Sequence, residues 1–199
     1  MAELTRELTH KERTRARILD EAAKAMRAEG HEGIGVADLM KRAGLTHGGF
    51  YAHFRNRDDL VAHAVARMFQ DSGAMLARHL DQGDAAAGLS ALIDYYLSDA
   101  MRQNVDKGCP LPGLSGEARR MPEAARERFG AGIVQFRAAL ERAIAALGLP
   151  DAPALSASVL AELVGAVTLA RAVDEGSGKE ILASVRAQLK GRLGLNGSS

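Results

Sequence analysis

The sequence predicts an all-α protein, built from a small unit of three helices followed by a larger helical bundle. Hydrophobic residues make up 47% of the 199 residues but aromatic residues only 4%, so aliphatic side chains must supply most of the core. Apolar residues recur three and four positions apart, which is the spacing of one helix face, and no segment alternates with the period of two that marks a strand.

The first 57 residues are predicted to hold three helices. We expect the first helix over residues 11–29, capped by Thr9, and the second over residues 36–43, ended by the turn at Gly44. A third, short helix follows, capped by Thr46 and running to residue 54. Phe50 and Phe54 are four residues apart, so both lie on the face of this helix that packs on the core.

The remainder of the chain is predicted to be a helical bundle. Asn56 caps a helix that runs to about residue 80, and a further helix spans residues 86–103. After a break at residues 108–113, three more helices are expected, the first of them beginning after Pro122 and the other two spanning residues 155–173 and 178–193. Because the segment 155–173 is apolar almost all round, it is expected to be buried on two sides, by the core and by a partner subunit. We therefore expect this helix to contact a partner subunit.

Charge and cysteine content limit the possible classes of function only weakly. The net charge is +1, but residues 1–57 carry 11 Lys and Arg against 8 Asp and Glu, whereas residues 58–199 carry 15 against 17. A positive N-terminal part is consistent with a nucleic-acid contact there. The single cysteine excludes an internal disulfide, and we expect neither a signal peptide nor a membrane-spanning segment. These features predict a soluble, cytoplasmic protein.

The most informative motif is the stretch VADLMKRAGLTHGGFYAHFRNRDDL at residues 36–60. A helix, a glycine turn and a second, polar-capped short helix are the parts of a helix-turn-helix, in which the second helix enters the major groove of duplex DNA. Gly48 and Gly49 each cost such a helix about 1 kcal/mol relative to alanine. They also let the backbone approach a groove wall closely, so we expect double-stranded DNA as a partner.

The leading helix, the segment AGLTHGGFYAHFRNRDDL and the all-helical remainder together resemble the tetracycline-repressor (TetR) family. The resemblance implies a DNA-binding domain at residues 1–57 and a ligand-binding and dimerisation domain at residues 58–199. It also implies a homodimer formed through the last two long helices, at about residues 155–173 and 178–193. It further implies a transcriptional regulator, most often a repressor, that leaves its operator when a small-molecule effector binds. The DNA-contacting residues implied by the resemblance are Thr46 at a phosphate, His47, Gly48 and Gly49 at base edges, and Tyr51, His53 and Arg57 at phosphates. Gly35 departs from the family's usual Ser or Thr at the start of the second helix.

Cys109 is the second candidate functional residue. Gly108 and Pro110 flank it, which predicts a position near a helix N-terminus, and Lys107 is close in sequence. Both features lower a thiol pKa and favour the reactive thiolate. The segment KGCPLPGL also resembles a TetR-family subgroup that senses electrophiles, unsaturated carbonyls or oxidants, and this resemblance implies Lys179 as a partner of the thiol. The alternative, an inert thiol buried in the core, stays open.

Three aromatic residues of the bundle, Tyr95, Tyr96 and Phe136, are candidates for lining an effector cavity, although aromatic side chains at helical spacing also form ordinary core. No metal or cofactor is expected: His47 and His53 are six residues apart, which is not the four-residue spacing of helical metal ligands. Two alternatives to a DNA-binding regulator are an enzyme that uses Cys109 as its nucleophile and a dimerisation protein that does not bind DNA. The sequence names neither the effector nor the operator, and it leaves activation and the number of dimers per operator open.

Overall fold

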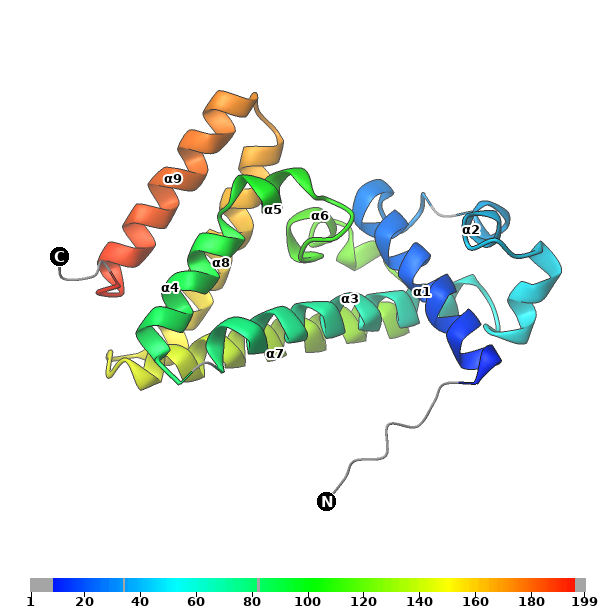
Figure 1. Ribbon diagram of the computed structural model, residues 1–199, viewed down its shortest axis with the longest axis horizontal. Coiled ribbons are helices and arrows are strands. Elements are labelled where there is room, and N and C mark those ends of the chain that lie inside the picture. The colour runs from blue at the N-terminus through cyan, green and yellow to red at the C-terminus, as the bar shows by residue number, and fades with distance from the viewer. Residues whose placement is uncertain (1–8, 34, 82, 196–199) are drawn as a thin grey trace, which may run out of the picture.

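The computed structural model describes residues 9–33, 35–81 and 83–195, and within these ranges the regular structure is helical throughout (Figure 1). The elements, in chain order, are α1 (His10–Glu29), α2 (Val36–Arg42), the 3-10 helix η1 (His47–Ala52), α3 (Arg57–Leu80), α4 (Ala85–Tyr96), α5 (Asp99–Gln103), α6 (Leu111–Leu114), the 3-10 helix η2 (Ala118–Arg120), α7 (Glu123–Ala146), α8 (Ala152–Arg171) and α9 (Glu175–Arg192). The predicted all-α class is confirmed.

Short polar side chains fix where the helices begin. The Thr9 hydroxyl accepts a hydrogen bond from the Glu12 N–H at 3.2 Å, and the Glu12 carboxylate accepts one from the Thr9 N–H at 2.7 Å, which completes a capping box at α1. The Asn56 side-chain oxygen accepts from the Asp59 N–H at 2.8 Å at the start of α3. The predicted roles of Thr9 and Asn56 are therefore confirmed, and each cap satisfies a backbone donor that has no partner within its helix.

Helix α8 begins at Ala152 instead of residue 155, because Asp151 accepts from the Ala154 N–H at 3.4 Å. Two further predicted boundaries are wrong because such caps were overlooked. The helix expected over residues 86–103 is divided into α4 and α5, because Ser98 caps a new helix by accepting from the Met101 N–H at 3.1 Å. The last helix begins at Glu175 instead of residue 178, because Asp174 accepts from the Ser177 N–H at 3.1 Å. In both places a local side-chain bond outweighs the hydrophobic pattern from which the boundary was predicted.

Two long helices form the axis of the molecule. Figure 1 shows α3 and α7 lying side by side, with α1, α2 and η1 at one end and α4, α8 and α9 towards the other. We call α1, α2 and η1 the head, and α3 to α9 the body. Phe69 of α3 packs edge-on against Phe129 of α7, with ring centroids 5.3 Å apart. A Cβ atom at Gly132 would lie only 2.3 Å from the Phe69 ring, so the glycine allows the two helices to approach closely.

Helix α8 is strongly apolar, although the sequence predicted no membrane-spanning segment. Its mean hydropathy of 1.6 over a window of 18 residues meets the length and composition of a membrane-spanning helix, a test that the core helices of soluble proteins also pass. In this fold α8 packs between α7 and α9. Its remaining face is exposed and carries Leu169, which is 60% exposed.

Candidate DNA-binding and effector sites

The head contains the predicted helix-turn-helix, formed by α2, the turn at Gly44 and η1. Gly44 has φ +68°, a left-handed backbone conformation that favours glycine, and it reverses the chain immediately after α2. The turn is closed by hydrogen bonds from the Gly44 N–H to the Lys41 carbonyl at 2.9 Å and from the Leu45 N–H to the Met40 carbonyl at 2.8 Å. These bonds fix the direction in which η1 leaves α2.

The buried face of η1 determines which residues it exposes. Phe50 and Phe54 are buried as predicted, and their ring centroids lie 5.6 Å apart. The opposite face therefore turns outward, and Tyr51 is 67% exposed with its ring edge-on to His47. The geometry presents a phenol hydroxyl and an imidazole to solvent on one surface of the head.

The start of η1 differs in detail from the prediction. The Thr46 side chain makes no capping hydrogen bond, so the predicted cap is wrong, and the residue is exposed to solvent. This happens because η1 is a tight 3-10 helix whose first bond runs between backbone groups, from the Gly49 N–H to the Thr46 carbonyl at 3.0 Å. Around Gly48 no atom lies within 4 Å of where a Cβ would be, so this part of the backbone is open to a close approach.

His53 is half-buried at the end of η1. Burial lowers the pKa of its imidazole, and the nearby Lys11 and Arg15 cations lower it further. Its Nδ1 atom is buried with no hydrogen-bond partner among the described residues. At neutral pH the ring is therefore uncharged and acts as a hydrogen-bond donor, not as a cation.

Arg57 has a different environment from the one expected of a phosphate contact. It is the first residue of α3, is half-buried, and its guanidinium donates to the backbone carbonyl of His31. The side chain is thus held inside the head by at least one hydrogen bond. The structure assigns it a role in joining α1 to α3, which the sequence pattern did not indicate.

Basic residues of α1 extend the exposed surface beside η1, and sequence reasoning missed them. A shallow hollow lies where the start of α1 meets the end of η1, lined by His10, Lys11, Arg17 and His53 among others. Arg15, one turn after Lys11, places its guanidinium 4.9 Å from the centre of the Phe54 ring. The cations at residues 11, 13, 15 and 17 are a sequence signal that would have identified this surface.

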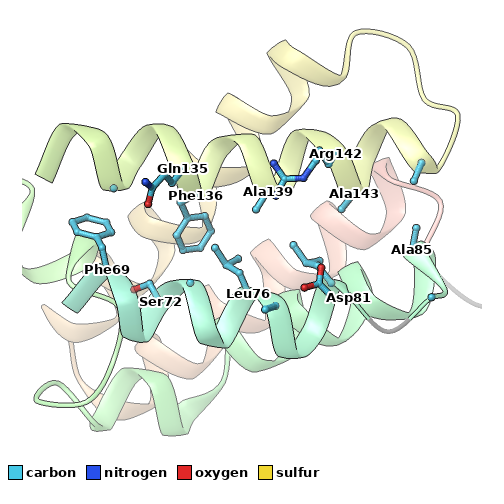
Figure 2. A pocket seen from close by; sticks show the side chains of 16 residues that line it. Phe69, Ser72, Leu76, Asp81, Ala85, Gln135, Phe136, Ala139, Arg142 and Ala143 are labelled. Atoms are coloured by element: carbon cyan, nitrogen blue, oxygen red, sulfur yellow. The ribbon is translucent and has the colours of Figure 1, made fainter. Parts of the chain in front are cut away.

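Two cavities of the body lie on different sides of α3. The larger, of about 420 Å³, lies between α3 and α7. Figure 2 shows Phe69 and Leu76 reaching into it from α3 and Phe136 from α7, with Gln135, Arg142 and Asp81 also on its walls. The apolar surface of these side chains, together with a few polar groups, is typical of a small-molecule site.

The smaller cavity, of about 260 Å³, lies between α3 and the segment that follows α5. Cys109, Lys107 and Tyr95 line it together with Arg78 and Ser72 of α3. Ser72 lines both cavities, so the two sites meet at one position of α3. Sequence reasoning identified Cys109 and Tyr95 but missed Arg78, which the fold alone brings to this cavity.

The Cys109 thiol is not the thiolate that its sequence context predicted. The side chain is only 5% exposed, and burial raises its pKa, while the neighbouring Tyr96 hydroxyl, Leu111 N–H and Ser72 hydroxyl act more weakly in the opposite direction. The prediction relied on a helix N-terminus and on Lys107. Helix α6 begins two residues later and is only four residues long, and Lys107 is exposed. Desolvation therefore dominates at this thiol.

Lys179 is also not placed as the resemblance implied. It lies within α9, not in a loop, is exposed, and its ammonium group bonds Glu175 one turn earlier. This ion pair raises the pKa of Lys179, and the next charges that act on it are those of Asp99 and Arg102. The implied pairing of Lys179 with Cys109 is therefore wrong in this structure.

The three candidate aromatic residues do not line one cavity. Tyr96 and Phe136 are fully buried and pack edge-to-face, with centroids 6.1 Å apart, but only Phe136 borders the larger cavity. Tyr95 is exposed at the smaller cavity and stacks on His79 at 5.1 Å. The adjacent positions 95 and 96 point to different sides of α4, so the core interpretation holds for Tyr96. Its hydroxyl is buried beside the Cys109 thiol, and burial together with this thiol raises the pKa of Tyr96.

Among the described residues, no group of three or more His, Cys, Asp or Glu side chains is arranged to hold a metal ion. The head and body thus present two kinds of surface: an exposed helix-turn-helix flanked by basic residues, and cavities of small-molecule size beside the helix that connects to it. These features together define a helix-turn-helix DNA-binding regulator with a helical regulatory body.

Comparison with known proteins identifies the family. Residues 18–64 match the family model described as bacterial regulatory proteins of the tetR family. An uncharacterised HTH-type transcriptional regulator of Mycobacterium tuberculosis is 30% identical over 170 residues, which cover 79% of this chain and 84% of that protein. The chain belongs to the TetR family of transcriptional regulators. Proteins of this family bind operator DNA and small-molecule effectors and form homodimers.

Solved structures support the same assignment. A TetR transcriptional regulator from Chloroflexus aurantiacus is 25% identical, with a TM-score of 0.80 over 92% of this chain and 96% of that one. E. coli NemR in its reduced form has a TM-score of 0.80 at 21% identity, over 90% of this chain and 96% of that one. At this lower identity the likeness to NemR shows the fold alone.

Proposed function

We propose that the chain is a homodimeric repressor that leaves its operator when a small molecule binds in its body. The observation that supports effector control is the position of the two cavities, which flank α3 and share Ser72. Helix α3 starts at Arg57 beside the head and ends at Leu80, so an effector in either cavity presses on the helix that joins body to head. Such an effector releases DNA only if it binds the released state more tightly than the DNA-bound state.

We infer that residues 1–57 form the DNA-binding domain and residues 58–199 the effector-binding and dimerisation domain of a cytoplasmic protein. The exposed surface of η1 supports contact with duplex DNA, because it combines an open backbone at Gly48 with the exposed Tyr51. The proposed contacts are Thr46, Tyr51 and His53 at phosphates and His47, Gly48 and Gly49 at base edges. Arg57 is proposed only as a secondary contact, since it already bonds His31.

The charge of the smaller cavity favours an acidic effector. Arg78 and Lys107 lie on its walls, while Asp71, the acidic residue there, is paired with Arg27 at 2.9 Å and Arg67 at 3.1 Å. The Lys107 ammonium group attracts an anion, and about 260 Å³ suits a small carboxylic acid. Because burial holds the thiol protonated, binding beside Cys109 without a covalent bond is favoured over addition of an electrophile.

The larger cavity is a second candidate site for a more apolar effector. Phe69, Leu76 and Phe136 form its walls, and the polar groups of Gln135 and Arg142 lie along α7 (Figure 2). Its greater volume suits a larger molecule whose apolar part lies between α3 and α7. Binding there is expected to spread these two helices.

The exposed faces of α8 and α9 support the proposed dimer interface. Most of the side chains there are small, which lets helices of two subunits approach closely. On α8 they are Ala154, Ala157, Ala161, Thr168 and the half-buried Gly165, beside the larger Leu169, and on α9 they are Gly176, Ala183, Ser184, Ala187 and Gly191. Pairing these faces buries the exposed Leu169 and completes a four-helix interface.

The direct test is binding of the purified protein to the DNA upstream of its own gene, followed by fluorescence anisotropy at several salt concentrations. We expect nanomolar affinity that falls steeply with salt, because phosphate contacts release counterions. A dimerisation protein without DNA binding, or an enzyme acting through Cys109, gives no saturable binding to this or any selected duplex.

The effector site is tested by adding a panel of small carboxylic acids to the protein–DNA complex. Lys107→Ala is expected to weaken release by an acid about tenfold, whereas Ala139→Trp, which fills the larger cavity, leaves it unchanged. The opposite pattern assigns the effector to the larger cavity. Cys109→Ser separates the two chemical versions, since a covalent effector loses its action on this variant and a noncovalent one retains it.

A further inference from the structure

One buried residue of the head, His31, joins three parts of the chain. Its backbone N–H donates to Glu117 Oε2 at 2.9 Å, and its ring Nδ1 lies 2.7 Å from the same oxygen. Its carbonyl accepts a hydrogen bond from Arg57, the first residue of α3. His31 is 2% exposed, so these contacts are shielded from water. The end of α1, the start of α3 and the segment after α6 thus meet at one point.

The backbone at the end of α1 is fitted around the Glu117 carboxylate. Gly30 has φ +83°, and a Cβ atom there would lie 2.7 Å from Glu117 Oε1. Only glycine satisfies both the backbone conformation and the close approach. Partial burial acts to raise the pKa of Glu117, but the hydrogen bonds from His31 outweigh it, and the pKa is lowered. The carboxylate is therefore ionised at neutral pH while it holds the turn.

Glu117 lies at one end of a segment that is hydrogen-bonded to α8 of the body. We call residues 101–117 the bridging segment. The Arg171 guanidinium of α8 donates to the carbonyls of Met101 at 2.7 Å and Arg102 at 3.1 Å. The Thr168 hydroxyl of α8 donates to the Pro112 carbonyl at 3.1 Å. Cys109, at the smaller cavity, lies within the bridging segment.

Contacts other than Glu117 hold α1 to α3 directly. Arg27 pairs with Asp71 at 2.9 Å, and Arg67 pairs with Asp20 at 2.7 Å. The head therefore remains attached to α3 when Glu117 is replaced. What the replacement removes is the carboxylate link between the Gly30–His31 turn and the bridging segment. The packing of α1 on α6 and a long hydrogen bond of 3.4 Å from Arg27 to the Asp106 carbonyl are kept.

We propose that Glu117 is the positioning residue through which a displacement of the bridging segment reaches the DNA-binding head. The inference rests on the proposed effector control of DNA binding, and it adds the route of that control. A shift of the segment pulls the Gly30–His31 turn, and through the His31 carbonyl it reaches Arg57 at the joint between η1 and α3. The turn that precedes α2 and the first residue of α3 then both respond to the Glu117 carboxylate, and these two helices flank η1 in the chain.

The test uses a substitution in place of the unidentified effector. A Cβ at Gly108 would lie 2.8 Å from the Met101 sulfur and 3.2 Å from the Asn104 carbonyl, both within the bridging segment, and 3.5 Å from the Arg171 guanidinium that holds this segment to α8. Gly108→Val therefore distorts the bridging segment and disturbs its contact with α8. The probe is a duplex that the wild-type protein selects from a random library. We expect Gly108→Val to change affinity for this duplex about fivefold to tenfold in the wild-type background, and less than about twofold with Glu117→Ala.

Two further variants control for charge and for chemistry. Glu123→Ala removes an exposed carboxylate six residues further on, and it is expected to leave the full effect of Gly108→Val. Glu117→Gln keeps an oxygen that accepts the His31 N–H, so it is expected to restore most of the coupling. If Gly108→Val proves unfolded by circular dichroism, Gly108→Ala imposes the same contact with a smaller side chain.

A second readout does not depend on DNA. Hydrogen exchange of the amides in residues 30–33 and 47–53 is expected to speed up on Gly108→Val in the wild-type and Glu123→Ala backgrounds, but not with Glu117→Ala. Equal responses in the Glu117→Ala and Glu123→Ala backgrounds, or no response of the head to Gly108→Val, overturn the proposal. Failure of the wild-type protein to select any duplex overturns the proposed function instead, and the exchange measurement still decides whether Glu117 couples the two parts.

Discussion

At the scale of single residues, burial decides which side chains carry out chemistry at the surface. Phe50 and Phe54 are buried, and they leave Tyr51 exposed on the opposite face of η1. Burial likewise keeps the Cys109 thiol protonated, although its neighbours in sequence suggested a thiolate. The same physical quantity supports one prediction and overturns the other. Two residue-scale predictions follow from it.

Replacing Tyr51 by Phe is expected to weaken binding to all duplexes by about tenfold, because it removes one hydrogen bond to a charged phosphate and no contact to a base. The measurement is fluorescence anisotropy with the selected duplex and with unrelated DNA. Tyr95→Phe, at an exposed tyrosine of the body, is the matched control and should bind as the wild type does. Changed base preference with unchanged affinity for unrelated DNA would contradict the phosphate role.

The raised pKa of Cys109 predicts slow labelling by thiol reagents. The thiol of the folded protein is neutral at pH 7, and its thiolate forms only at a pH above the ordinary value for cysteine. We expect native protein to react at least tenfold more slowly than protein unfolded in urea, with a rate that still rises with pH where a free thiol has levelled off. The reagent reports this site alone, since the chain has one cysteine. Fast labelling at pH 7 would support the covalent mechanism.

At the scale of helices, the sequence predicted most of what the backbone does. Apolar spacing located α1, α2, α3 and α7, and Asn56 marked the start of α3 correctly. The division of α4 from α5 was missed, because the apolar spacing continues across Ser98, whose side chain caps a new helix. Long-range contacts such as that of His31 with Glu117, 86 residues apart, leave no local pattern and required the folded structure.

The two candidate sites also differ in how far the sequence alone could predict them. The DNA-binding motif is one short stretch of sequence, so its residues could be recognised without the fold. The smaller cavity is assembled from α3 and the bridging segment, and Arg78 joined Cys109 only in the structure. Lys179 lies in the last helix even within its predicted bounds of residues 178–193, so its pairing with Cys109 was implied by the resemblance alone and not by a local pattern.

The close packing of α3 on α7 predicts opposite effects for two glycines on α7. A Cβ at Gly132 would lie 2.3 Å from the Phe69 ring, whereas at Gly130 nothing lies within 4 Å. We expect Gly132→Ala to lower the free energy of unfolding by about 1–3 kcal/mol, because the Phe69 ring must shift. Gly130→Ala should raise it by about 1 kcal/mol, the gain in helix propensity. Urea unfolding measures both, and similar values would show that the ring moves without cost.

At the scale of the whole molecule, the function depends on two heads held at a defined separation. A symmetric dimer reads two half-sites, whose centres are about 34 Å apart when they are separated by one turn of DNA. The bridging segment contacts α8 through Arg171 and Thr168, and α8 carries the proposed dimer face. Effector, dimer interface and head are therefore connected within a few residues of one another, and the dimer is the unit on which an effector acts.

The dimer interface gives the last prediction. Ala161 is exposed near the middle of α8, among the small side chains that we propose contact the partner subunit. Ala161→Glu places a charge there, which dimerisation must bury without a matched partner. We expect the dimer dissociation constant to rise about a hundredfold, equivalent to roughly 3 kcal/mol, as measured by analytical ultracentrifugation. Ala131→Glu, at an exposed position of α7, is the control and should stay dimeric.

Because a monomer contacts only one half-site, Ala161→Glu should also lose most of its operator affinity. Its circular dichroism spectrum should match that of the wild-type protein, which shows that the helices are still folded. A dimer that survives Ala161→Glu but dissociates with Ala131→Glu would place the interface on α7 and move the point at which the bridging segment meets the partner subunit.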